Sequence, residues 1–255
     1  MPDLPSSLIT LAVAGAMAAL GAAAGGGCGC VALAYRRGID AGAPADASTM
    51  ARSLRMVIWP GGVAGARRRL LFSFSLASGF SRPAAFIMAA AFSALFARHG
   101  LSACFLVTAM AGALLLLSAL IDAQTGLLPD ALTQPLLWLG LAASWMGVGL
   151  PLHDAFAGAM LGYSLLWCLL TALRWFSGRD AMGHGDLKLL AALGAWLGWQ
   201  PLPWALLLAC LAGLVFAMWR QKSLRPRGAY PFGPFLAMGG AGVFLNSTAV
   251  HSWFW

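Results

Sequence analysis

The chain has 255 residues, of which 60% are hydrophobic and 9% charged, whereas soluble domains carry about 25% charged residues. With a mean hydropathy of +0.80, this composition excludes a soluble globular enzyme, a disordered chain and a secreted disulfide scaffold. It predicts a membrane protein that crosses the bilayer several times. All eight carboxylates are Asp, and the net charge is +8. We attribute this surplus to basic loops beside the membrane and expect no binding to nucleic acid.

Eight apolar segments are predicted to cross the bilayer. In chain order they cover residues 8–35, 83–97, 101–121, 131–150, 155–176, 187–199, 204–219 and 232–250. The longest polar stretch, residues 36–69, contains seven Arg and follows the first span. The apolar stretch 70–80 is predicted to lie at the membrane interface, because a spanning helix needs ~20 residues.

The basic residues predict how these spans are oriented, because basic loops stay on the cytoplasmic side. With the N-terminus outside, fifteen of the sixteen basic residues fall in inner loops, and only Arg98 falls outside. We therefore expect an all-α, polytopic integral membrane protein with about eight transmembrane helices and both termini outside.

Two carboxylates lie where chemistry is expected. Asp122 follows an apolar run at the end of the third span, and Asp186 opens the sixth. The sixth span has ~13 residues, or ~20 Å, against a hydrocarbon core of ~30 Å. Asp186 is therefore predicted to lie below the inner surface, in an unusual turn that Gly183 and Gly185 permit.

The direction of the spans places both carboxylates on the cytoplasmic side. Two Asp at one depth are suited to an aspartyl-protease dyad, because close like charges favour a state in which the pair holds one proton. The alternative is that Asp122 and Asp186 are helix-end carboxylates that never meet.

Three further residues lie near this predicted site. Asp130 follows Pro129 and is predicted to be the N-cap of the fourth span, with a supporting role near the site as the alternative. Lys188 either pairs with a site carboxylate or holds the loop at the interface. His184 has no partner at a metal-ligand spacing, and the other three His are predicted to lie outside, so no metal site is expected.

Three segments of the chain, taken together, resemble the prepilin peptidase family. Residues 121–141, which run from Ile-Asp through Leu-Leu-Pro-Asp, resemble the first catalytic block of that family. Residues 183–198 resemble the second block, which carries the GxGD signature, and residues 230–237 (YPFGPFLA) resemble its last inner-loop motif. The resemblance covers the chain from about Ser81 onward.

The resemblance implies a GxGD aspartyl endopeptidase of the bacterial inner membrane. Such an enzyme removes basic leaders from type IV prepilins or type II secretion pseudopilins at the cytoplasmic face. Asp122 and Asp186 would be catalytic. The supporting motif would consist of Gly183, Gly185, Lys188, Pro129 and Asp130. The implied partners are these substrates and the lipid bilayer, and peptidase activity would need no cofactor.

The resemblance divides the chain into residues 1–82 and residues 83–255, the second being the peptidase domain. Bifunctional relatives usually carry two CxxC pairs in the first inner loop, in a part that serves N-methylation. Residues 36–81 contain no Cys. We therefore expect no zinc, and S-adenosylmethionine as a cofactor only if methyltransferase activity is retained.

Two other classes of function remain as alternatives. A polytopic transporter also uses broken helices and intramembrane Asp residues, but would place them near the bilayer centre and show an inverted repeat. An assembly factor would not need the dyad and would survive its neutralisation.

Overall fold

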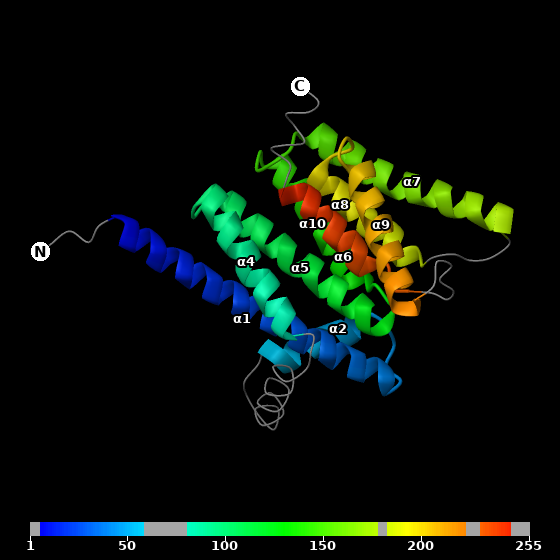
Figure 1. Ribbon diagram of the computed structural model, residues 1–255, viewed down its shortest axis with the longest axis horizontal. Helices are drawn as coiled ribbons and strands as arrows, with labels where there is room; N and C mark the ends of the chain where they lie inside the picture. Colours follow the sequence, from blue (N-terminus) through cyan, green and yellow to red (C-terminus); the bar gives the residue numbers. More distant parts are fainter. Residues whose placement is uncertain (1–5, 59–80, 178–182, 223–229, 246–255) are drawn as a thin grey trace, which may run out of the picture. The chain divides into compact units, whose positions relative to one another are not determined.

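The computed structural model describes residues 6–58, 81–177, 183–222 and 230–245. Within these ranges the chain is all-α, as predicted (Figure 1). The helices are α1 (Ser6–Asp40), α2 (Ala47–Ile58), α4 (Ser81–His99), α5 (Ala103–Thr125), α6 (Asp130–Trp145), α7 (Leu152–Ser177), α8 (His184–Leu197), α9 (Leu202–Gln221) and α10 (Gly233–Leu245).

Four of the described helices are long and apolar enough to cross a membrane. They contain the segments Val13–Asp40, Ala103–Thr125, Leu152–Ala172 and Leu202–Gln221. Each of the eight apolar segments predicted from the sequence overlaps a described helix; segment 131–150 extends beyond the end of α6 at Trp145, and residues 246–250 of the last segment lie outside the described residues. The number of spans and their orientation stay predictions. The stretch 70–80, predicted to be interfacial, lies outside the described residues.

The chain divides into two compact units, Met1–Leu120 and Ile121–Trp255. The division falls within α5, close before Asp122. The predicted boundary between a peptidase domain and the preceding segment, at residues 82 and 83, stays a prediction.

In the first unit, α1 packs along α4 at close range. A Cβ atom at Gly25 would collide with the backbone of Ala84, so the two helix backbones touch there. The T-shaped contact of Phe92 with Phe105, with ring centroids 5.8 Å apart, joins α4 to α5.

Helix α2 lies within the Arg-rich stretch, for which the sequence predicted only a loop. Its N-cap is formed by Asp46, whose Oδ1 accepts hydrogen bonds from the Thr49 N–H at 3.0 Å and the Ser48 hydroxyl at 2.8 Å. These bonds hold the pKa of Asp46 below its ordinary value, and the bond from Thr49 has the largest effect. Buried Met50 and Ser53 form one face of the helix, while Arg52 lies exposed.

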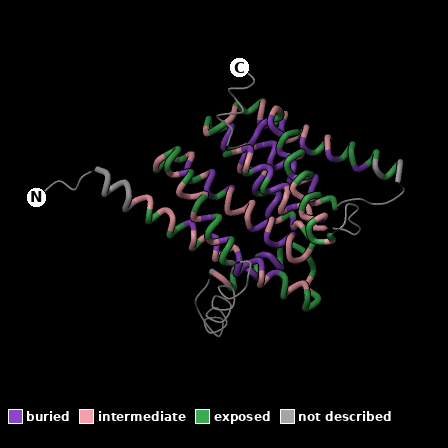
Figure 2. Tube along the Cα trace, in the orientation of Figure 1, coloured by how far each residue is buried: buried purple, intermediate pink, exposed green. Residues whose placement is uncertain are grey.

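The second unit is built around α8, which contacts α6, α7, α9 and α10. Ten of its fourteen residues are buried, and Figure 2 shows buried residues gathered along it. Small residues permit this packing. A Cβ atom at Gly194 would collide with the backbone of Gly158 in α7, so these two helices are in backbone contact.

Candidate active site

Asp122 lies in the last turn of α5, three residues before the helix ends at Thr125. Its side chain is buried, with 4% of the residue exposed. Oδ2 accepts a hydrogen bond of 2.8 Å from the backbone N–H of Gly233, the first residue of α10. A carboxylate in this position has its geometry set by a residue 111 positions along the chain.

Asp186 is the third residue of α8 and is also buried, with 7% exposed. Its Oδ1 accepts no hydrogen bond from any residue in the described part of the chain. The predicted unusual turn at this point is wrong. Gly183 is the N-cap of α8 with φ −75° and ψ 148°, which any residue adopts. Gly185 is needed for space, because a Cβ atom there would lie 2.7 Å from Cβ of Leu128.

The register of α8 and α10 places the two carboxylates at one level. Gly240 of α10 packs on Leu193 of α8. Gly233 and Asp186 each lie seven residues before these packed positions, which is about two helical turns. The two helices run in the same direction. Asp122 is held by Gly233 through the hydrogen bond to its Oδ2. The structure therefore places at one level the two residues that the sequence paired, and their action as a dyad stays a prediction.

Lys188 and Asp130 join the beginnings of α8 and α6. Nζ of Lys188 lies 2.7 Å from both carboxylate oxygens of Asp130. The prediction of Asp130 as an N-cap is wrong: Pro129 is the N-cap, and Asp130 is the first helical residue, with its carboxylate on Lys188. Of the two roles considered for Lys188, the structure thus shows pairing with a carboxylate, that of Asp130.

Side chains further along α6, α8 and α9 keep this end of the unit in register. The Trp196 indole N–H donates to the Leu136 carbonyl at 2.9 Å, which holds α8 on α6. The Gln221 amide donates to the Tyr230 hydroxyl at 2.7 Å, which ties the end of α9 to the segment before α10. Phe216 packs on both Tyr230 and Phe235, with ring centroids 6.2 and 5.3 Å apart.

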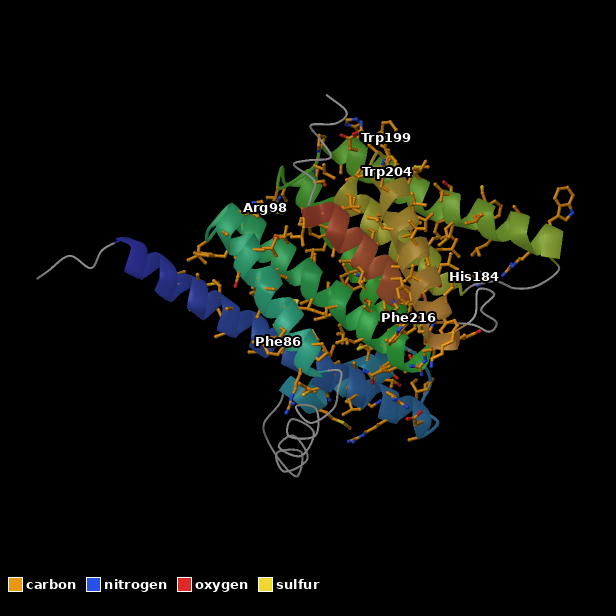
Figure 3. All side chains as sticks on the ribbon, viewed as in Figure 1. Phe86, Arg98, His184, Trp199, Trp204 and Phe216 are labelled. Carbon is orange, nitrogen blue, oxygen red and sulfur yellow. The ribbon has the colours of Figure 1, made fainter. Side chains whose placement is uncertain are left out.

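Figure 3 shows that the second unit has two distinct ends. His184, at the start of α8, and Phe216 lie toward the end that carries the carboxylates. Trp199 and Trp204 lie at the opposite end. No cluster of three His, Cys or Asp side chains that could hold a metal ion occurs among the described residues.

Sequence reasoning missed the role of Gly233. The motif at residues 230–237 was recognised, but its contact with Asp122 was not. The available signal was a Gly between two Phe-containing pairs, which indicates a close approach without naming the partner.

Residues 109–218 match the Type IV leader peptidase family. This region of the chain is therefore similar to that family, and the resemblance predicted from the motifs is confirmed. Three relatives named prepilin leader peptidase/N-methyltransferase show the same similarity. The protein of Burkholderia pseudomallei (strain 1026b) is 48% identical over 145 residues, which are 56% of this chain and 46% of the relative.

The Dickeya chrysanthemi protein is 52% identical over 131 residues, 50% of this chain and 46% of the relative. The Pseudomonas aeruginosa protein is 46% identical over 141 residues, 52% of this chain and 49% of the relative. The chain thus spans about half the length of the curated relatives it matches. No solved structure matches this chain.

Proposed function

We propose that this chain is a membrane aspartyl endopeptidase that removes the basic leader from type IV prepilins or type II secretion pseudopilins. The observation that carries the proposal is the pair Asp122 and Asp186, both buried at one end of a helix bundle that is similar to the leader peptidase family. Relatives named prepilin leader peptidase/N-methyltransferase support the choice of substrate.

The proposed chemistry uses one proton shared by two carboxyl groups. The ionised member takes a proton from water as the water oxygen bonds to the scissile carbonyl carbon. The protonated member gives its proton to the carbonyl oxygen. The first group then passes its proton to the peptide nitrogen as the C–N bond breaks, and the second recovers a proton from one hydroxyl of the tetrahedral intermediate, which becomes the carboxylic acid. Both groups end as they began.

The proposed setting is the bacterial inner membrane, with about eight spans and both termini outside. The shared level of Asp122 and Asp186 at one end of the second unit supports a site near one membrane face. The basic residues make that face cytoplasmic. A reporter fused within residues 36–69 should be cytoplasmic and one after Trp255 periplasmic. A cytoplasmic C-terminus would contradict this topology.

Residues 1–82 are proposed to be a zinc-less form of the methyltransferase-associated region. Two carboxylates among the described residues of this region have local partners. Asp40 pairs with Arg36 at 3.7 Å, and Asp46 caps α2. We derive no methyl-transfer step from this region. S-adenosylmethionine would supply the methyl group if the activity is retained.

The test is incubation of the purified full chain with a prepilin in detergent or lipid, followed by mass spectrometry. We expect a product shortened by the leader, with the new N-terminus either unmodified or, when S-adenosylmethionine is added, heavier by one methyl group. An intact prepilin after incubation, with a known leader peptidase active in the same assay, would contradict the proposed function.

A further inference from the structure

The two carboxylates of the pair differ in the hydrogen bonds that they accept. Oδ2 of Asp122 accepts the Gly233 N–H at 2.8 Å in a buried setting. Oδ1 of Asp186 is buried without a hydrogen bond from any described residue. Two carboxylates at one level therefore differ in the hydrogen-bond donors that face them, and a donor that faces a carboxylate makes it easier for that carboxylate to carry a negative charge.

Helix α10 strengthens the donor at Asp122. Gly233 begins a helix of 13 residues, and the N-terminus of a helix carries a partial positive charge that stabilises a nearby anion. The next residue is Pro234, which has no N–H, and the N–H groups of Phe235 and Leu236 donate to the Phe232 carbonyl. The Gly233 N–H is thus the donor of this helix turn that is directed at the carboxylate.

The close approach requires that residue 233 have no side chain. A Cβ atom there would lie 2.7 Å from Oδ2, 3.0 Å from Cγ and 3.1 Å from Cβ of Asp122. Helix α10 cannot easily withdraw, because the Gln221–Tyr230 hydrogen bond and the Phe216 contacts hold its start against α9. Any larger residue must therefore displace the carboxylate.

The charged side chains that follow Asp186 in α8 and begin α6 are paired with each other. Lys188 and Asp130 form an ion pair with each other at the start of α8 and α6. Among the described contacts of Asp122, the Gly233 N–H is the hydrogen bond that its side chain accepts.

We propose that Gly233 is a positioning residue that gives the two carboxylates of the pair different roles. Its N–H holds Asp122 as the carboxylate that takes the proton from water, and Asp186 is the protonated partner that donates to the scissile carbonyl. This inference rests on the proposed peptidase function. In the steps given above, Asp122 is then the first group and Asp186 the second, and the proton balance is unchanged.

The decisive experiment compares Gly233→Ala with Gly242→Ala in the full chain. Both lie in α10, and a Cβ atom at Gly242 meets nothing within 4 Å. We expect Gly233→Ala to lower kcat by about 10²-fold, the cost of a misplaced catalytic group, with a nearly unchanged KM. Gly242→Ala should match the wild type in activity and melting temperature.

The pH profile separates positioning from mere packing. Loss of the donor to Asp122 should move the acidic limb of the kcat profile of Gly233→Ala to higher pH and leave the alkaline limb in place. If Gly233→Ala does not fold, Tyr230→Phe, which removes the anchor from Gln221, should move the same limb by a smaller amount.

The outcomes distinguish this inference from the proposed function. A wild type that does not cleave prepilin overturns the proposed function. A wild type that cleaves, with a Gly233→Ala variant of equal kcat, overturns the inference alone. Movement of the alkaline limb instead of the acidic limb overturns the assignment of Asp122 as the base.

Discussion

The carboxylates of the two units are held in opposite ways. In the first unit, Asp40 pairs with Arg36 four residues away, and Asp46 binds groups two and three residues away. In the second unit, Gly233 is 111 residues from Asp122, Lys188 is 58 from Asp130, and Trp199 is 45 from Asp154. Asp154 also has a near neighbour as a partner, His153 at 3.0 Å.

This difference separates carboxylates that are held within one helical turn from carboxylates that are held by contacts between helices. Contacts within one helical turn stabilise that turn and do not depend on how the rest of the chain packs. Contacts between distant helices exist only after those helices have packed, so they can set the geometry of a site to a fraction of an ångström. The second unit, which holds the distant contacts, is also the one in which both buried carboxylates of the proposed dyad stand.

The largest effect on leader cleavage is expected from removal of either carboxylate of the proposed dyad. Asp122→Asn and Asp186→Asn should each lower leader cleavage at least ~10³-fold, because an amide can neither take the proton from water nor supply one as an acid does. Mass spectrometry of prepilin after incubation measures this. The control is Asp46→Asn, which keeps a capping side chain on α2 and should cleave normally. Full cleavage by either dyad variant at normal membrane levels would contradict the assignment.

Packing in the second unit is tested at the contact of α7 with α8. Gly194→Val should destabilise the protein by about 3 kcal/mol or more, because its side chain collides with the Gly158 backbone and overpacking of this kind is costly. The melting temperature in detergent should fall clearly. Gly112→Ala, at a site with nothing within 4 Å of the added Cβ, should leave it unchanged. Equal melting temperatures would contradict the packing.

The ion pair between Lys188 and Asp130 should matter less than the dyad. Both side chains are partly exposed, at 34% and 61%, and exposed pairs contribute at most about 1 kcal/mol. We expect Lys188→Met and Asp130→Asn each to lower kcat about fivefold. The double variant should be no worse than either single one, because the two side chains act as one unit. Additive losses in cleavage rate would show that they act separately.

The cap of α2 should have a local and pH-dependent effect. The pKa of Asp46 is lowered by its hydrogen bonds, so its contribution to α2 is present above its ordinary value and is lost as pH falls through the lowered value. The protection of the amide protons in residues 47–58, measured as their exchange rate relative to the unfolded chain at the same pH, should therefore fall below about pH 4. In Asp46→Ala this protection should be low at all pH values. Cleavage at neutral pH should not change. High protection in the variant would contradict the cap.

The smallest effect is expected from chelation. Residues 36–81 contain no Cys, and a structural zinc site usually needs four Cys or His ligands. We expect elemental analysis of the purified protein to find no stoichiometric zinc, and a chelator to leave the melting temperature and cleavage unaffected. About one zinc per chain would contradict this expectation.

The sequence by itself determined the apolar helices and the two candidate carboxylates. Runs of some twenty apolar residues have few alternatives to a helix, because every backbone polar group must be paired away from water. A carboxylate beside such a run is costly unless it serves a purpose, which is why Asp122 and Asp186 stood out among eight Asp residues. The spacing of the motifs then indicated the family that the chain resembles.

Only the tertiary structure decided which groups meet at the site. Asp130 has the sequence context of an N-cap, yet its carboxylate binds Lys188, since α6 and α8 begin side by side. Gly183 and Gly185 suggested an unusual turn, but one adopts an ordinary backbone and the other provides room for Leu128. The N–H of Gly233 reaches Asp122 across 111 residues. No local pattern encodes that distance, because it depends on how α8, α9 and α10 stack against one another.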